Sequence, residues 1–184
     1  MCRIDAAAKE AAVARFLRKF PSAAETGREH PALRGCGTIA RQEFPGCPAD
    51  VPALLRALLD AAAAAEAERV LCDVLMDGVF HMGPAMPTAL PYLIRLTADP
   101  QVPIRSTLLE LLLVVAELSH PVDEGGERAV RLFGGDRDHP ERARCRAVFA
   151  DHADVLRALL EDETLPGEPL RPDERESLLQ AAAV

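Results

Sequence analysis

The sequence predicts an all-α protein that consists mainly of helical hairpins, and three observations support this prediction. Alanine, which favours helices and is uncommon in strands, provides 32 of the 184 residues. Aromatic residues make up only 4% of the chain, so its core has to be built from Leu, Val and Ala. A pattern of apolar residues, one Arg and a closing acid recurs along the chain. Because nearly half of the residues are apolar, residues 1–184 can form one domain with a substantial core.

For residues 1–50 the sequence predicts one helix followed by a long linker. Residues 5–20 carry apolar side chains at helical spacing, with Asp5 suited to an N-cap and Pro21 suited to end the helix. The rest of this segment is rich in Gly and Pro, which indicates a long connection with one helical turn near 39–43.

The predicted hairpins lie in residues 51–184, because one sequence pattern occurs there three times. Segments 51–60, 90–99 and 154–162 each contain apolar residues around one Arg and end in an acid. The first two Arg positions are 39 residues apart, near the period of a helical-hairpin repeat, and the next interval is 62 residues. We interpret the difference as an insertion at 119–140, a segment rich in Gly, Pro, His and charged residues. The three Arg positions are Arg56, Arg95 and Arg157.

A second predicted helix follows each of the three segments. These helices cover 61–77, 103–118 and a C-terminal stretch that opens at Pro172. The helix at 103–118 is apolar nearly all round from Leu108 to Ala116, which is typical of a helix buried on several sides.

Residues 85–118 resemble a HEAT repeat. They combine an amphipathic first helix, an Asp-Pro turn at Asp99 and a Leu-rich second helix. In that family the turn Asp and the following Val and Arg connect one hairpin to the next, and the matching residues are Asp99, Val102 and Arg105. Pro103 and Ile104 separate the Val from the Arg, whereas the family usually has them adjacent.

The resemblance extends more weakly to 51–77 and 152–183 and is absent from 1–50. The chain is also similar to short HEAT-like proteins of GC-rich bacteria, and His81, Gly83 and the stretch 90–93 carry this similarity. It implies a short right-handed α-solenoid of about three HEAT-like hairpins, with the extra N-terminal helix packed on the first hairpin.

The charge of the chain favours a protein partner over a nucleic acid. With a net charge of −8 and a pI near 5.1, the chain repels phosphate backbones and suits a basic protein. The longest apolar run is too short to cross a membrane, and the N-terminus has no apolar signal region. Five cysteines without a CxxC motif are typical of a reduced, cytoplasmic protein.

The connection at 77–87 is the most unusual segment, and two interpretations of it remain open. Phe80, His81, Met82 and Met86 could form an adaptable binding loop, because Met and Phe offer apolar surface and His titrates near neutral pH. Alternatively, the Phe and the two Met fill a packing gap between hairpins, and His81 bonds a local carbonyl.

No pattern in the sequence predicts catalysis, a metal site or a cofactor. The five His and five Cys residues lack the short spacings of a structural zinc site, and there is no GxSxG, GxGxxG or P-loop motif. The paired carboxylates lie in predicted loops or at helix ends, where solvated charge is the ordinary explanation.

The sequence therefore predicts a protein-binding module. Solenoids bind along the surface lined by the second helix of each hairpin. Small size, acidity and the family resemblance suggest an immunity- or antitoxin-like protein that masks a basic, toxin-like partner. A HEAT-like enzyme or nucleic-acid-associated factor and a self-associating structural protein remain alternatives, so both a monomer and a homodimer are open. The polar candidates for the binding surface are Arg69, Asp73, Asp77, Arg105, Glu110 and Glu117.

Overall fold

The computed structural model describes residues 6–38, 48, 50–123, 125–162, 164–165 and 170–183. Helices dominate this part of the chain, and its strands are limited to one short antiparallel pair, so the all-α prediction is confirmed. The predicted N-cap at Asp5 and the predicted turn near 39–43 lie outside the described residues. The elements are α1 (Ala6–Lys19), the 3₁₀ turns η1 (Ala23–Glu25), η2 (Pro31–Leu33) and η3 (Cys36–Thr38), α2 (Val51–Ala57), α3 (Ala64–Leu75), β1 (Met76–Gly78), β2 (His81–Met82), α4 (Met86–Ala98), α5 (Arg105–Ser119), α6 (Glu127–Phe133), α7 (Pro140–Asp151), α8 (Ala153–Glu161) and α9 (Pro172–Ala181).

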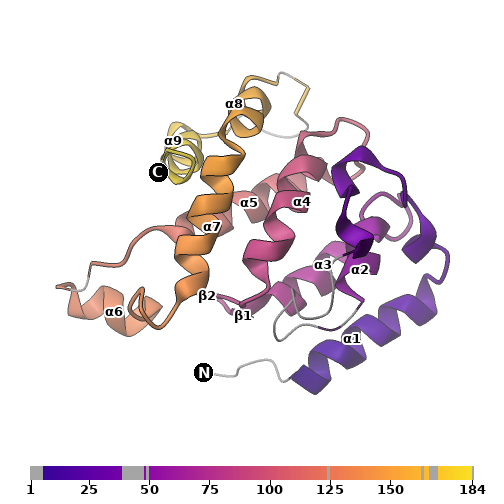
Figure 1. Cartoon of the computed structure of the whole chain (residues 1–184), viewed down its shortest axis with the longest axis horizontal. Helices are drawn as coiled ribbons and strands as arrows, with labels where there is room; N and C mark the ends of the chain where they lie inside the picture. The colour runs from indigo at the N-terminus through magenta and orange to yellow at the C-terminus, as the bar shows by residue number, and fades with distance from the viewer. Residues whose placement is uncertain are drawn as a thin grey trace.

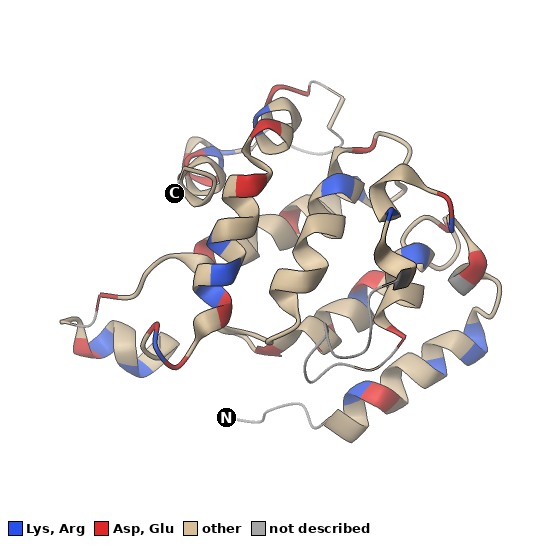
Figure 2. Ribbon diagram, viewed as in Figure 1, with Lys and Arg blue, Asp and Glu red and all other residues tan. Residues whose placement is uncertain are grey.

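The helices α4 and α5 form the centre of the molecule (Figure 1). They pack against each other, α7 packs against both, α8 lies on α4, and α9 lies on α5. On the other side of the centre, α2 and α3 form a hairpin, and α1 packs against α3, as the sequence predicts for the N-terminal helix. Figure 2 shows that α4 is almost free of charged residues, which are frequent on α1, α6, α7 and α9.

Aliphatic side chains make up most of the core. Leu, Val and Ala provide most of its residues, as the composition predicts, and Phe16 and Phe149 are its largest fully buried side chains. Cys145 is a small core residue that is completely buried in α7. Because such side chains pack closely, they can fill the space around the buried helices α4 and α5.

A shared local structure underlies the acid that closes each repeated segment. In each case the carboxylate accepts a hydrogen bond from the backbone N–H two residues further on, at 2.8 to 2.9 Å. This side-chain turn ends the first helix of the hairpin and starts the reversal toward the second. The three pairs are Asp60 with Ala62, Asp99 with Gln101, and Asp162 with Thr164.

The segment between the second and third hairpins is more structured than the predicted insertion at 119–140. It holds the short helix α6, which has no buried side chain, and leads into α7, which packs into the centre of the molecule. The α7 sequence is strongly polar and has no clear apolar face, so its periodicity gives no sign of this central position.

The hairpin boundaries otherwise follow the sequence prediction within a few residues, and α5 begins at Arg105 instead of Pro103. Within the described part of the chain, each helix is too short or too polar to cross a membrane.

Candidate functional site

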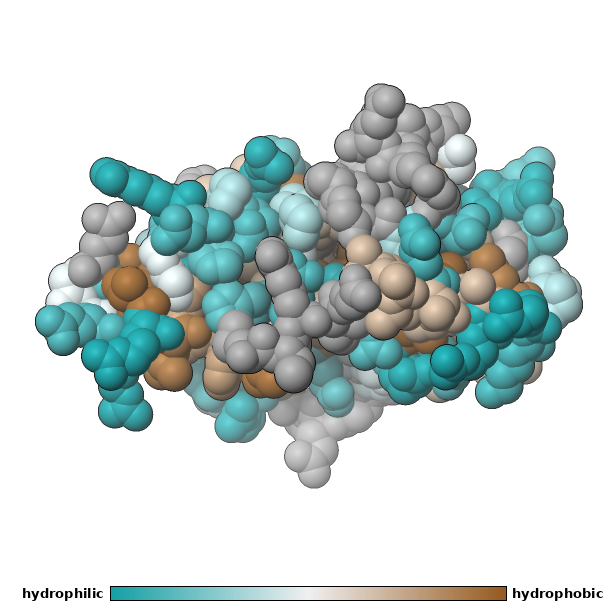
Figure 3. Space-filling model, turned by 90° about the horizontal axis from the view of Figure 1, so that it is seen from below, coloured by the Kyte–Doolittle hydropathy of each residue, from teal (hydrophilic) through white to brown (hydrophobic). Residues whose placement is uncertain are grey.

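Most of the exposed large apolar residues lie at one place on the molecule. Among the described residues there are five of them, and Val79, Phe80 and Val114 line the same groove. Leu132 is the neighbour of Phe133, which forms part of the groove wall, and only Leu179 belongs neither to the groove lining nor to α6. Figure 3 shows hydrophobic surface on the side of the molecule where α6 lies, bordered by hydrophilic residues, and further hydrophobic surface toward the opposite end. Exposed apolar clusters of this kind are typical of interaction sites.

The groove has a volume of about 680 Å³ and runs over α5, with α9 on one side and the β1–β2 turn and α6 on the other. Its lining is mainly apolar, and its polar residues carry mostly negative charge. We call it the α5 groove. Its lining residues are Val79, Phe80, Glu110, Leu113, Val114, Glu117, Leu118, Phe133, Arg171, Asp173, Glu174 and Ser177.

The floor of the groove is the outer face of α5. Glu110, Leu113, Val114 and Glu117 are spaced three and four residues apart and therefore lie on one helical face. The opposite face carries fully buried side chains such as Leu112 and packs on α4 and α7. As the sequence predicted, α5 is buried on several sides, by α4, α7 and α9. Its outer face is uncovered, and Val114 is 46% exposed. Helix α9 touches the edge of this face, where Ser177 donates to Glu117, without covering Val114.

One wall of the groove is an aromatic contact between distant segments. Phe80 in the β1–β2 turn meets Phe133 at the end of α6 edge to face, with ring centroids 5.6 Å apart. Such aromatic pairs add to the stability of a contact beyond the area that they bury. The contact therefore ties the exposed turn to α6.

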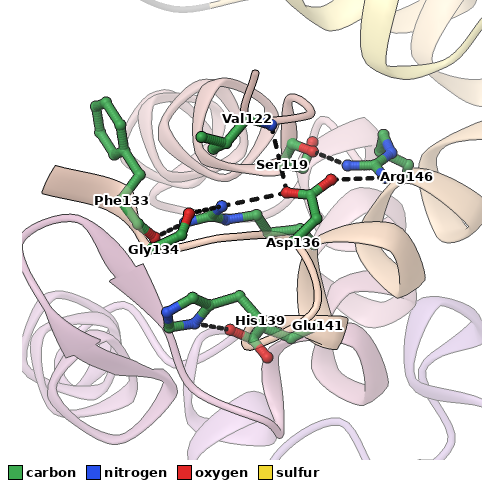
Figure 4. Close-up of polar contacts among 9 residues, drawn as sticks. Ser119, Val122, Phe133, Gly134, Asp136, His139, Glu141 and Arg146 are labelled. Atoms are coloured by element: carbon green, nitrogen blue, oxygen red, sulfur yellow. Dashed lines mark hydrogen bonds and ion pairs between the residues drawn. The ribbon is translucent and has the colours of Figure 1, made fainter. Parts of the chain in front are cut away.

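A buried arginine fixes the end of α6 that supplies Phe133. Arg142, at 3% exposure, donates to the carbonyl oxygens of Phe133 and Gly134 and to the Asp136 carboxylate. The same carboxylate accepts from the backbone N–H of Val122 at 3.3 Å and pairs with Arg146 (Figure 4). Charge-assisted bonds of this kind hold the groove wall in place although α6 buries none of its own side chains.

The rim of the groove is acidic. Four carboxylates and one guanidinium line it, which gives a net charge of −3 when all are ionised. Arg171 pairs with Glu174 at 2.8 Å and lowers the pKa of that carboxyl group. Glu117 accepts from the Ser177 hydroxyl at 3.2 Å. Glu110 has no hydrogen-bond or ion-pair partner among the described residues.

A second, smaller pocket of about 400 Å³ lies beside the groove wall and contains two histidines. The rings of His81 and His139 are 4.9 Å apart, and Nδ1 of His139 lies 2.8 Å from a carboxylate oxygen of Glu141 (Figure 4). Nδ1 of His81 is buried and has no hydrogen-bond partner in the described structure. Burial, followed by the proximity of His139 and Arg142, lowers the pKa of His81. In the described ranges, no group of three or more His, Cys, Asp or Glu side chains is placed to hold a metal ion.

The structure separates the two interpretations of segment 77–87 residue by residue. Met82 and Met86 are buried, and Met82 lies 3.9 Å from the Cys145 thiol, so both side chains fill the core. Phe80 is 43% exposed in the groove, and His81 faces the histidine pocket. Of the four residues predicted in this segment, only Phe80 therefore offers apolar surface of the kind that the binding interpretation requires, and its neighbour Val79 adds to that surface.

The predicted polar residues fall into three places. Glu110 and Glu117 join Phe80 in the α5 groove. Asp73 pairs with Arg69 at 3.0 Å on the exposed side of α3, outside the groove lining. The other two, Asp77 and Arg105, make long-range ion pairs: Asp77 accepts from the buried amine of Lys9 at 2.7 Å, and Arg105 is itself 2% exposed. A buried guanidinium is not accessible to a partner in this conformation.

Apart from Phe80, the apolar residues of the groove were missed in the sequence. Val79, Val114 and Phe133 come from a turn, a central helix and an inserted helix, and no local pattern connects them. The one sequence feature that could have indicated the groove is the apolar circumference of α5. This feature does not show whether any face of the helix stays uncovered.

Compared with models of known protein families, with curated proteins and with solved structures, the chain matches none of them. The function of the chain is therefore inferred from the geometry of the groove and from its charges.

Proposed function

We propose that this protein is a protein-binding module that holds a basic partner protein in the α5 groove. The observation that carries this proposal is the combination of an uncovered apolar floor with a rim of net charge −3. Apolar contact area supplies most of the affinity of such a site, while the charge selects a partner of opposite sign and speeds its association. The net charge of −8 over the whole chain acts in the same direction.

The proposed architecture is a short right-handed solenoid of about three HEAT-like hairpins. Three features support it: the repeated Asp turns, the packing of α8 on α4 and of α9 on α5, and the link between Arg105 and Asp162. In this architecture α5 is the second helix of the middle hairpin, and second helices are the ones that line the binding surface of a solenoid.

The biological role that fits best is that of an immunity- or antitoxin-like protein that masks a basic, toxin-like partner. Such a role needs an acidic surface that binds its partner tightly, and it needs no catalytic group. We place it in the cytoplasm, where the free thiols of Cys36, Cys72 and Cys145 would stay reduced.

The proposal is tested with the partner recovered from the native host, purified and titrated against the protein by calorimetry. Val114→Asp places a charge on the apolar floor and should weaken binding by at least about tenfold. The matched control is Leu179→Asp, which changes the exposed apolar residue of α9 that is not part of the groove lining and should bind like the unaltered protein.

A charge-reversing pair tests the rim. Glu110→Lys with Glu117→Lys should weaken binding and flatten its dependence on salt, because the partner then meets two positive charges. The exposed acid Asp151 serves as the control, since Asp151→Lys changes the net charge by the same amount per residue away from the groove. Equal binding by the groove and control variants, or recovery of a nucleic acid as the partner, would overturn the proposal.

A further inference from the structure

The outer face of α5 has the geometry of a helix-packing surface. Glu110 and Glu117 lie seven residues apart, which is about 10 Å or two helical turns along the axis. Between them, Leu113 and Val114 form the apolar part of the stripe, and ridges of residues three and four apart are what a second helix packs into. The neighbouring face of α5 is already packed by a helix in this way, because α9 lies against it.

The dimensions of the groove favour side chains of a helix over a complete buried element. A volume of about 680 Å³ accommodates a few large apolar side chains, as in grooves that receive anchor residues at positions i, i+3 or i+4, and i+7. Two walls, α9 and the Phe80–Phe133 pair, flank the floor and would confine such anchors laterally.

Strand addition is not a suitable alternative at this site. The described strands are three and two residues long, and they already pair with each other. An edge of that length offers too few backbone groups for an added strand.

The placement of the charges predicts the polar flanks of the occupant. Glu110 and Glu117 mark the two ends of the apolar stripe on α5, and Asp173 lies on the α9 wall. A helix whose apolar face meets Leu113 and Val114 would therefore need Lys or Arg along the flank that faces these carboxylates. The aromatic wall on the other side needs only apolar contact.

A second copy of this chain is a poor occupant for the same reason. In a two-fold symmetric dimer the same surface faces itself, so the acidic rim of one copy would lie against that of the other. Like charges brought together in this way oppose association.

We infer that the α5 groove receives one amphipathic helix of the partner, with an apolar face toward α5 and a Lys- or Arg-rich flank beside Glu110, Glu117 and Asp173. This inference rests on the proposed function, because it names the part of a basic partner that the groove holds. The partner helix would lie along α5 and be clamped between α9 and the Phe80–Phe133 wall.

The test uses synthetic peptides and the full-length protein. A helical peptide of Leu and Lys in amphipathic order is the probe, and its binding is measured by fluorescence anisotropy. Two peptides of the same length are the comparisons: one with Glu in place of Lys, and one with a central Pro that breaks the helix. The Leu/Lys peptide should bind best, and each comparison should bind at least about tenfold more weakly.

The same titrations with variant proteins locate the site. Val114→Asp and the pair Glu110→Lys with Glu117→Lys should each weaken binding of the Leu/Lys peptide at least about tenfold, whereas Leu179→Asp should leave it unchanged. Circular dichroism of each variant shows that it is folded, and the rim pair, being on the surface, provides a second route if Val114→Asp disturbs the fold.

The outcomes separate this inference from the proposed function. Equal binding of the Pro-containing or Glu-containing peptide, or loss of peptide binding in Leu179→Asp, would overturn the inference. If the native partner binds in a manner sensitive to Val114→Asp while none of the peptides binds, the helix inference fails and the proposed function stands. If neither partner nor peptide responds to Val114→Asp, both fail.

Discussion

Arg105, the first residue of α5, donates to the carboxylate of Asp162, the residue that follows α8, over a distance of 2.6 Å. The same guanidinium donates to the carbonyl oxygen of Thr97 in α4 at 2.9 Å. Because Arg105 is only 2% exposed, these bonds join the middle hairpin to the last one from the interior. A residue that the sequence suggested for the binding surface therefore holds two hairpins together.

Replacement of Arg105 should destabilise the protein without a change in the groove. In Arg105→Met the buried carbonyl of Thr97 loses a charged donor, and we expect the free energy of unfolding to fall by about 2 kcal/mol. Denaturant unfolding followed by circular dichroism measures this, with Arg157→Met as the exposed control. A value unchanged from that control would show that the link does not contribute to stability.

The protein should lose stability in acid through Asp162. The Thr164 hydroxyl, Arg105 and the Thr164 backbone N–H lower the pKa of this carboxyl to about 2, from an ordinary value of 3.8. Its contribution is thus present above pH 3.8 and is lost as the pH falls from there toward 2. In thermal unfolding, Asp162→Asn should lose less stability over this pH range than the unaltered protein. Asp154→Asn, which changes an exposed carboxyl, should lose as much stability as the unaltered protein.

A second pH effect should come from His81. Its pKa is lowered by burial and by the nearby His139 and Arg142, although Glu141 and Asp77 act in the opposite direction. The unfolded chain therefore takes up this proton more readily than the folded protein. The contribution of His81 to the free energy of unfolding is fully present above the ordinary pKa of 6.5, and it falls as the pH decreases through the range just below that value.

The histidine effect is measured by thermal unfolding between pH 7.5 and 5, a range chosen to span the ordinary pKa of about 6.5. His81→Gln should flatten the profile, since the titrating ring is absent, whereas His152→Gln should leave its slope in place. A profile that is the same in both variants would exclude His81 as the group responsible.

The contact between Lys9 and Asp77 should anchor α1. The Lys9 amine donates to the carbonyl of Val74 at 2.8 Å and to the Asp77 carboxylate at 2.7 Å, and its side chain is 5% exposed. Lys9→Met should lower the free energy of unfolding by about 1–3 kcal/mol, because the buried Val74 carbonyl and the partly buried Asp77 carboxylate each lose the bond from the Lys9 amine. Hydrogen exchange should show the loss of protection in α1, and Lys19→Met, an exposed change on the same helix, is the control.

Met86 and Phe80 should differ in their effects, although both belong to the segment 77–87. Met86→Ala should cost about 2–5 kcal/mol of stability, because the side chain is completely buried in the core. Phe80→Ala should cost less than about 1 kcal/mol because its ring is partly exposed, yet it should weaken peptide binding to the groove. Equal stability losses in the two variants would contradict the separation of packing from binding roles.

Local features of the fold could be predicted from the sequence because local interactions produce them. The helical spacing of apolar residues at 5–20 predicts α1, and the Leu-rich stretch at 103–118 predicts α5. The closing acids predict the turns at Asp60, Asp99 and Asp162. The central position of helix α7 escaped prediction because its contacts come from distant helices, and its own sequence is too polar to show a buried face.

The site shows the same division. The sequence by itself determined that α5 would be apolar around most of its circumference and that the chain would be acidic, because both follow from composition and spacing. Only the tertiary structure decided which face of α5 would remain uncovered, and that Phe80 and Phe133 would meet beside it. It also turned Arg105 inward to Asp162. These outcomes depend on contacts between residues about fifty or more positions apart, and no local pattern of side chains specifies which distant helix will cover which face.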